Sequence, residues 1–361
     1  MSVVATRYGK MRIIDSDSLV SRALALYGEW AMDELTLLGE IIAPGMSVLD
    51  VGAFIGTHTL AFSKFTGERG KVYSFEPRKE IFNILSENIT QNNCINTTAY
   101  NIGLAEKEYT LSLEALDVDR ELNYGGLELS GLVSTVGPDN YQMKVSTIDS
   151  LGIDKIDVIK IDAEGMEVRV LEGAVKSIMR NRPIIFAECN SLDAGNKLLN
   201  FCNSIQYESY GFLPSAFNPG NFNANRDNIF GSAKESALVL IPLEKKSDAI
   251  LNIINKHLLT IAGLDDLVLL LLHKPQYPYE VLALTKPSSA LGINYPSPGL
   301  SEQIVGLNKT LQERDEQIVH LQHSNEKLVK EINEILSSIS WCITQPLRTL
   351  LSWWSLFNRK K

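Results

Sequence analysis

Short runs of apolar and β-branched residues alternate with segments of helical periodicity from residue 45 onward. Each run has the length of a strand that is buried on both faces of a parallel sheet. Seven such runs occur, at residues 47–51, 71–75, 98–102, 158–161, 184–187, 208–212 and 237–241. Strands separated by helices form βαβ units with right-handed crossovers. The pattern therefore predicts an α/β fold with a doubly wound, mostly parallel seven-stranded sheet, whose ligand lies at the carboxyl ends of the strands.

The segments on either side of these strands follow other patterns. Residues 1–44 carry apolar positions at helical spacing and end at Pro44 and Gly45, so we expect an N-terminal helical segment. The α/β domain then covers residues 45–245. Residues 246–300 contain two amphipathic helical stretches, followed by a linker with five prolines that should be extended.

Two stretches inside the domain lack periodicity. Residues 111–142 are polar and rich in glycine, which predicts a surface hairpin or excursion near the ligand. Residues 214–231 are rich in Asn, Gly and Pro and predict a long loop. Because long loops in compact domains are commonly functional, we expect both stretches to set acceptor specificity; a variable surface is the alternative.

A seven-residue repeat covers residues 301–340. Its a and d positions hold mostly Ile and Leu, and a single Asn325 at an a position is a known device for fixing register and a dimeric state. The positions are Ile304, Leu311, Ile318, Asn325, Ile332 and Ile339 at a, and Leu307, Arg314, Leu321, Leu328, Ile335 and Cys342 at d. We predict a C-terminal coiled coil that forms a homodimer. The alternatives are a helix folded back on the globular domain and a trimer.

The last residues, 341–361, form a basic amphipathic tail that holds three of the four tryptophans of the chain. No acidic residue follows Ile335, and four cations do, ending with Arg359, Lys360 and Lys361. Tryptophan beside basic residues suits a bilayer interface. We expect the tail to bind a membrane surface, or alternatively a protein partner.

Charge and cysteine content narrow the class of protein. The net charge of −9 would repel a phosphate backbone, so we expect no nucleic-acid partner. Four cysteines without C-x-x-C spacing predict reduced thiols. No run reaches the roughly 18 apolar residues of a membrane span, and no secretory signal is evident. We expect a cytoplasmic protein, peripheral at most at the inner face of the membrane.

The strongest chemical signal is the block VLDVGAFIGTHT, in which a strand passes through a glycine turn into a helix. Gly52 and Gly56 let the backbone approach a ligand, and the helix start offers amide donors. The spacing is not the G-x-G-x-x-G of nicotinamide-dependent dehydrogenases. Glu76 follows Gly52 by 24 residues at the end of the next strand, where a carboxylate can bind the hydroxyls of a ribose.

Three blocks resemble the FkbM-type family of Rossmann-like class I S-adenosylmethionine-dependent methyltransferases. They are VLDVGAFIGTHT, SFEP, and IDVIKIDAEGMEVRVLEGA preceded by VSTIDSL. The resemblance implies that S-adenosylmethionine is the cofactor and is bound by Asp50, Gly52, Ala53, Gly56, Thr57, Glu76 and Asp162. It places Asp162 beside the sulfonium, with Glu164, Gly165 and Glu167 shaping the acceptor side.

The candidate catalytic residues are Asp162, Glu164, His58 and Glu188. Carboxylates that crowd at the end of a strand could attract a sulfonium, deprotonate an acceptor hydroxyl or bind a divalent ion, and crowding raises the pKa of at least one of them. Glu167 is either part of this group or a solvated helix position. We predict no metal site, because the histidines outside the core show no ligand spacing.

These features predict an O-methyltransferase. FkbM-type enzymes are associated with methylation of natural products and saccharides, and the tail segment SWCITQPLR resembles a motif at the ends of bacterial glycan-assembly enzymes. We therefore expect the acceptor to be a hydroxyl of a sugar or polysaccharide in bacterial glycan biosynthesis. The alternative is a coiled-coil scaffold of a glycan-assembly complex, in which the methyltransferase domain is secondary or inactive.

Overall fold

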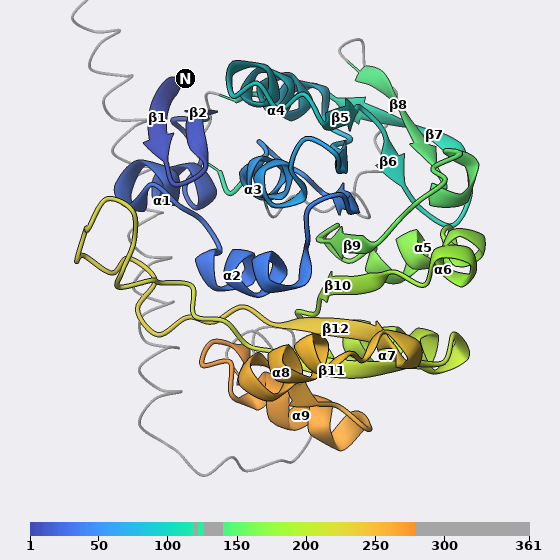
Figure 1. Ribbon diagram of the computed structural model, residues 1–361. Helices are drawn as coiled ribbons and strands as arrows, with labels where there is room; N and C mark the ends of the chain where they lie inside the picture. The colour runs from blue at the N-terminus through green and yellow to red at the C-terminus, as the bar shows by residue number, and fades with distance from the viewer. Residues whose placement is uncertain (119–121, 126–139, 279–361) are drawn as a thin grey trace, which may run out of the picture. The chain divides into compact units, whose positions relative to one another are not determined.

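The computed structural model describes residues 1–118, 122–125 and 140–278 (Figure 1). The predicted coiled coil at 301–340 and the tail at 341–361 lie outside the described residues and stay predictions. Among the described residues, no helix is both long and apolar enough to cross a bilayer.

The centre of the fold is a mixed sheet of eight strands, in the order β13-β11-β12-β10-β9-β3-β4-β5. The strands are β3 (Ser47–Val51), β4 (Lys71–Phe75), β5 (Thr97–Tyr100), β9 (Val158–Ile161), β10 (Ile184–Glu188), β11 (Tyr207–Phe212), β12 (Ala237–Pro242) and β13 (Leu259–Thr260). Neighbours from β10 to β5 run parallel, whereas β12 runs antiparallel between β10 and β11. All seven predicted strands form, and the short β13 adds an eighth.

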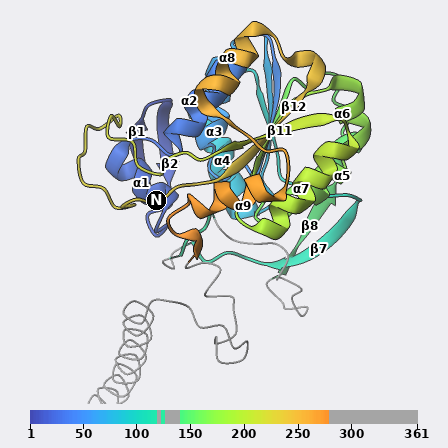
Figure 2. The ribbon, with the colours of Figure 1, turned by 90° about the horizontal axis from the view of Figure 1, so that it is seen from below.

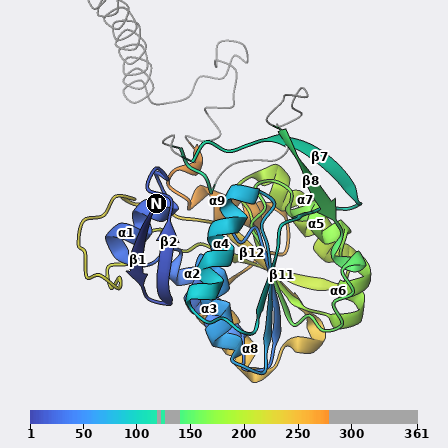
Figure 3. The ribbon, with the colours of Figure 1, turned by 90° about the horizontal axis from the view of Figure 1, so that it is seen from above.

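Helices cover both faces of this sheet, because successive side chains of each central strand point to opposite sides. Leu49 and Val51 pack into one apolar cluster and Val48 into another. The first cluster includes residues of α5 (Glu167–Glu172), α6 (Val175–Asn181), α7 (Leu192–Ser204) and α9 (Leu264–Leu272); the second includes residues of α2 (Met32–Ile41), α3 (Thr57–Thr66) and α8 (Asp248–His257). Figures 2 and 3 show the sheet edge-on, with α2 and α3 on one side and α5, α6 and α7 on the other.

The N-terminal segment is not simply helical. It begins with a hairpin of β1 (Ser2–Thr6) and β2 (Gly9–Ile13), followed by α1 (Val20–Tyr27), which ends at Gly28 in the left-handed conformation before α2 begins. The expectation of helix alone is corrected here. A two-stranded hairpin buries a single face, so its short polar-apolar alternation is a weak signal: Met11 and Ile13 are buried in a third cluster, while Val3 stays exposed.

The predicted excursion at residues 111–142 is a hairpin. Strands β7 (Tyr109–Glu114) and β8 (Asn140–Ser146) pair antiparallel, and β8 also pairs with β6 (Gly103–Leu104). The described residues between them return to the N-terminal segment. The Leu122 amide donates to the Ser16 carbonyl, and the Tyr124 amide donates to the Asp17 carboxylate.

The loop at residues 214–231 packs against the N-terminal helices (the yellow loop beside α1 in Figure 1). The buried Glu29 carboxylate accepts from Asn218 Nδ2 at 2.6 Å and from the Phe222 amide at 3.0 Å. Arg7 pairs with the same carboxylate at 2.7 Å. A buried charge held by this many donors fixes the loop to the fold.

Helix α4 (Lys79–Gln91) connects the hairpin to the sheet through the fully buried Asn88. Its Oδ1 accepts from the Arg12 amide, and its Nδ2 donates to the carbonyls of Arg12 and Ile55. We expect Asn88→Ala to lower the free energy of unfolding by about 2–4 kcal/mol, because one buried and two part-buried backbone groups lose their partner. Urea unfolding measures this difference. Asn83→Ala, at an exposed position of α4, is the control, and an equal loss in both variants would contradict the role of Asn88.

Candidate active site

The turn between β3 and α3 requires its two glycines. Gly52 has φ +78°, and a Cβ there would lie 1.7 Å from the Asp162 carbonyl oxygen. Gly56, with φ +96°, is the N-cap residue of α3. The amides of Gly52 and Ala53 both donate to the Phe75 carbonyl at the end of β4. The backbone of the turn therefore lies directly against the ends of β4 and β9, with no side chain between them.

Glu76 follows β4, is 6% exposed, and is held by two backbone amides. Its Oε2 accepts from the Phe54 amide at 3.1 Å and its Oε1 from the Arg78 amide at 2.8 Å. Burial raises the pKa of Glu76 to about 7, against the lowering effect of these amides and of the Arg78 charge. Because a carboxylate can accept about four hydrogen bonds, it can still bind two hydroxyl groups.

Lys160 stands in the middle of β9 and is 2% exposed. It lies opposite Asp50 in the register of β3 and β9. Its Nζ is 3.1 Å from Asp162 Oδ2 and 4.0 Å from Asp50 Oδ1. Burial lowers the pKa of Lys160, but the charges of Asp162 and Asp50 outweigh it and the net shift is upward, so the ammonium stays charged. Asp50 also accepts from Thr59 Oγ1 at 2.6 Å and lies beneath the glycine turn.

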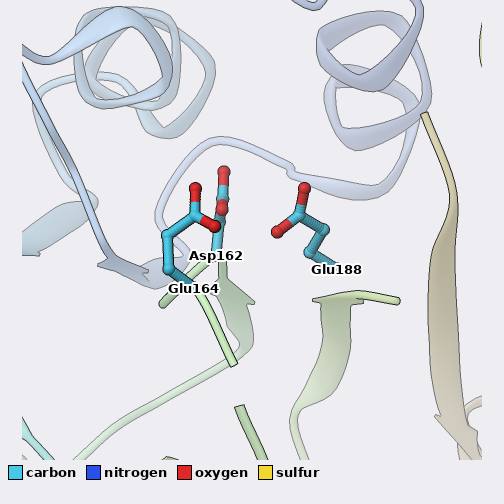
Figure 4. Close-up of side chains that lie close together, drawn as sticks. All are labelled: Asp162, Glu164 and Glu188. Carbon is cyan, nitrogen blue, oxygen red and sulfur yellow. The ribbon is translucent and has the colours of Figure 1, made fainter. Parts of the chain in front are cut away.

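Three predicted carboxylates meet at the carboxyl ends of β9 and β10. Asp162, Glu164 and Glu188 each place a carboxylate oxygen within 4.8 Å of the others (Figure 4). Burial raises the pKa of Glu188 well above its usual range, and the charges of Asp162 and Glu164 raise it further. The pKa of Asp162 stays lowered despite burial, because Lys160 stabilises its charge. Of the two carboxyl groups, Glu188 therefore takes up a proton more readily than Asp162.

The trio has oxygen ligands of the kind that divalent cations prefer. However, Lys160 Nζ already donates a hydrogen bond to Asp162, so the lysine ammonium supplies a positive charge next to these carboxylates.

Two other predicted residues have structural partners. His58, in the first turn of α3, is 4% exposed, and its Nε2 lies 3.3 Å from Glu34 Oε2. Glu167 is buried, so the alternative of a solvated helix position is wrong. Its Oε1 accepts from the amides of Ala163 and Gly165, which holds the turn that carries Glu164.

These groups surround one cavity of about 450 Å³. Eight of the ten predicted site residues line it: Gly52, Ala53, Thr57, His58, Glu76, Asp162, Glu164 and Glu188. The other two do not line it: Asp50 lies beneath the glycine turn, and Gly56 is the N-cap residue of α3. The volume lies within the roughly 300–1,000 Å³ of small-molecule sites.

Further lining residues were not predicted. Lys160 lies within the block IDVIKIDAEGMEVRVLEGA, and the one sequence signal of its role is that a lysine interrupts an otherwise apolar strand. Trp30 and Glu34 come from the N-terminal segment, and Lys274 and Gln276 follow α9. No sequence motif marks these four residues, because only the packing of distant segments brings them to the cavity.

The two predicted specificity stretches differ in their relation to the cavity. Asn123, Tyr124 and Gly125, from the excursion, line it. No residue of the loop 214–231 does, although that loop is described throughout. The expectation that this loop contacts the acceptor is corrected: its side chains are used to hold the N-terminal helices.

Comparison with solved structures finds methyltransferases of low identity. One is the methyltransferase FkbM from Methylobacillus flagellatus KT, with 18% identity and a TM-score of 0.36 over 54% of this chain and 43% of that one. The chain thus spans less than half of the length of that protein. Another is a SAM-dependent O-methyltransferase from Thermotoga maritima, with 11% identity and a TM-score of 0.35 over 68% and 79% of the two chains.

A third structure is a proposed methyltransferase from Streptococcus mutans in complex with SAH, with 12% identity and a TM-score of 0.34 over 58% and 96% of the two chains. No curated protein matches the chain. The family model of the methyltransferase FkbM domain matches residues 50–227. Residues 50–227 thus form a domain of the FkbM methyltransferase family. The match confirms a methyltransferase domain, for which the sequence blocks predict S-adenosylmethionine as the cofactor.

The residues of the FkbM domain fit this cofactor. Glu76 presents a buried carboxylate with unused lone pairs, which suits the two hydroxyls of a ribose. Gly52 and Ala53 line the cavity without bulky side chains. The carboxylates at the end of β9 provide negative charge for a sulfonium. S-adenosylmethionine supplies an activated methyl group when bound there.

We expect cofactor affinity in the FkbM domain to depend on the ionisation of Glu76. Ribose hydroxyls donate to the ionised carboxylate, so affinity rises as pH increases toward about 7 and levels off above it. Glu76→Gln should weaken binding about a hundredfold and remove this pH dependence, because an amide accepts fewer hydrogen bonds. Calorimetric titration with S-adenosylhomocysteine measures both effects. Glu68→Gln, at an exposed position, is the control; a pH-dependent affinity that survives in Glu76→Gln would contradict the assignment.

We expect Lys160→Met to lower the free energy of unfolding by about 3–5 kcal/mol, because it leaves Asp50 and Asp162 without their cation. The double variant with Asp50→Asn should recover part of the loss. Thermal or urea unfolding provides the comparison. The exposed Lys155, paired with Asp157, is the matched control, and its change to Met should cost no more than about 1 kcal/mol. A similar cost for both lysines would show that the buried pairing is not required.

Proposed function

We propose that this FkbM methyltransferase transfers the methyl group to a hydroxyl of a sugar or polysaccharide in bacterial glycan biosynthesis. The observation that carries the proposal is the cluster of Asp162, Glu164 and Glu188 in the lining of the cavity, where burial and the neighbouring charges raise the pKa of Glu188. An alcohol is a weak acid, so its methylation is assisted by a nearby proton acceptor. A carboxyl group with a raised pKa serves this purpose better than an ordinary one.

The residues of the chain have two tasks in this reaction. The glycine turn and Glu76 hold the cofactor, and the walls of the cavity exclude water and position the acceptor, which supplies most of the rate. The second task concerns the proton. As the acceptor oxygen forms its bond to the methyl carbon and the carbon–sulfur bond breaks, the O–H proton passes to the ionised carboxylate of Glu188. The thioether product leaves neutral, and the proton later exchanges with solvent.

The rest of the lining supports an acceptor rich in hydroxyl groups. Asn190, Glu235 and Gln276 present amide and carboxylate groups, and Trp30 and Tyr124 present aromatic rings. Polar groups at fixed positions among aromatic side chains give orientation and specificity in small-molecule sites. A polyhydroxylated ring can use donors and acceptors of this kind together.

Two sequence features outside the described residues support a partner and a location for the protein. The heptad pattern at 301–340 supports a homodimer, and the tryptophan-rich basic tail at 341–361 supports contact with the inner face of the membrane or with a glycan-assembly protein. Either contact would bring a cytoplasmic enzyme to the place where lipid-linked glycans are assembled.

The test is transfer of a labelled methyl group from S-adenosylmethionine to a panel of saccharides by the full chain. We expect methyl ether formation on at least one of them. Glu188→Gln should lower kcat about a hundredfold or more, within the range for loss of a general base, while cofactor binding is unchanged. The exposed Glu172→Gln is the control. Cofactor binding without transfer to any saccharide, but with transfer to an amine or thiol acceptor, would overturn the proposed substrate class.

A further inference from the structure

Trp30 brings an indole ring to the cavity from outside the family match. It lies between α1 and α2, before the match begins at residue 50, and it lines the cavity. Its side chain is half-buried and packs on the apolar cluster that also includes Tyr124, a second aromatic residue of the lining. An indole is large, rigid and flat, so it can cover one face of a ring-shaped ligand.

The indole of Trp30 is held by the loop 214–231, which does not itself line the cavity. The Phe230 ring lies against it edge-to-face, with 5.9 Å between the ring centroids and 64° between the ring planes. Phe230 also contacts the ring of Tyr27 at 5.7 Å, and Tyr27 contacts Phe217 at 5.4 Å. Aromatic pairs in such arrangements attract each other beyond the effect of the area that they bury. The loop thus acts on the cavity through Phe230.

Tyr27, at the end of α1, fixes the loop just before Phe230. Its hydroxyl donates to the Asp227 carbonyl at 2.6 Å and accepts from the Ile229 amide at 3.0 Å. Its backbone carbonyl accepts from the Asn223 amide. Because Tyr27 binds the loop with its ring, its hydroxyl and its carbonyl, Phe230 has a fixed place beside the indole.

The backbone next to Trp30 has an uncommon conformation. Ala31 has φ +49° and ψ +46°, in the left-handed region that is unfavourable for a residue with a Cβ. Such a conformation persists only where the surrounding contacts require it, and it is common at ligand sites. Here the contacts are those of Trp30 with Phe230 and of Glu29 with the donors of the loop. The loop therefore helps to set the direction in which the chain carries Trp30 to the cavity.

Polar side chains share the lining with the indole. Glu34 lies in the first turn of α2, soon after Trp30, and Asn123 comes from the excursion; both line the cavity. A pyranose ring has an apolar face of C–H groups and a rim of hydroxyl groups. It therefore binds best to a flat apolar surface that is combined with hydrogen-bonding groups at fixed positions. This part of the cavity offers both.

We propose that Trp30 is an acceptor-binding residue, whose indole lies against the apolar face of the sugar ring, and that Phe230 is a positioning residue that holds the indole there. The proposal rests on the sugar acceptor given under the proposed function. Trp30 precedes residues 50–227 and Phe230 follows them. The fit of the acceptor ring is therefore set by residues on either side of the family match.

The kinetic test uses the full chain and the saccharide that accepts the labelled methyl group. We expect Trp30→Ala to raise KM for this saccharide about tenfold, with a smaller change in kcat, because the sugar loses its stacking surface. The affinity for S-adenosylhomocysteine should not change. Trp30→Phe keeps an aromatic face and should recover most of the loss in KM, which a purely structural role of the residue would not produce.

The positioning role is tested with Phe230→Ala. We expect a rise in KM of about threefold with unchanged kcat and cofactor affinity, since the indole stays in the cavity but is held less firmly. Phe222→Ala is the matched control, because Phe222 lies in the same loop and its side chain is 47% exposed. Its KM should equal that of the wild type.

The emission of Trp30 reports on its ring directly and needs no acceptor. The chain has four tryptophans, so the Trp30 signal is the difference between spectra recorded with and without Trp30→Phe. We expect Phe230→Ala to move this signal to longer wavelength, because water reaches more of the indole, and Phe222→Ala to leave it in place. Adding the active saccharide should change the signal in the wild type.

The outcomes separate this proposal from the proposed function. An unchanged KM in Trp30→Ala, with saccharide transfer intact, would overturn the role of Trp30 and leave the sugar acceptor standing. A loss of affinity for S-adenosylhomocysteine in Trp30→Ala would also overturn it and assign the indole to the cofactor. Unchanged emission and KM in Phe230→Ala would overturn the positioning role. Transfer to an amine or thiol alone, with a KM that depends on Trp30, would support an acceptor-binding indole and reject the sugar.

Discussion

The site depends on the pairing of one buried ammonium group with two carboxylates. Lys160 reaches the partly exposed Asp162 and approaches Asp50 from the centre of the sheet, where Lys160 and Asp50 are both buried. Ions of this kind are tolerated only in mutual contact. The pairing requires β3 and β9 to lie side by side with Asp50 opposite Lys160. The same register places Gly52 directly against the Asp162 carbonyl. The pairing of β3 with β9 therefore also forms the floor of the cofactor cavity.

Three carboxyl groups around this floor, the buried Glu76 and Glu167 and the half-buried Glu188, have different partners. Glu76 is held by backbone amides, and its remaining lone pairs suit hydroxyl donors. Glu167 gives an oxygen to two amides of the turn that carries Glu164, which is a structural task. Glu188 faces other carboxylates, whose charges add to burial in raising its pKa. Burial raises the pKa of all three, whereas their hydrogen-bond partners and neighbouring charges differ.

The cavity is completed by segments that the family model does not match. Residues 50–227 contribute the cofactor side, whereas the N-terminal helices supply Trp30 and Glu34, and the segment after α9 supplies Lys274. The loop 214–231 stabilises this arrangement indirectly, through the Glu29 carboxylate. The cavity thus combines residues inside the family match with residues from the segments on either side of it.

The sequence by itself determined the strands of the sheet, the glycine turn and the positions of Glu76, Asp162 and Glu188, because apolar runs and strand ends are local properties of the chain. It indicated neither the N-terminal hairpin, which buries one face only, nor the role of Lys160, whose partners lie on another strand. Only the tertiary structure decided that Glu167 is buried, that Lys274 donates to Asn190 in the lining of the cavity, and that the loop 214–231 does not line the cavity. These facts depend on contacts between residues distant in sequence, and such contacts leave no periodic pattern in the chain.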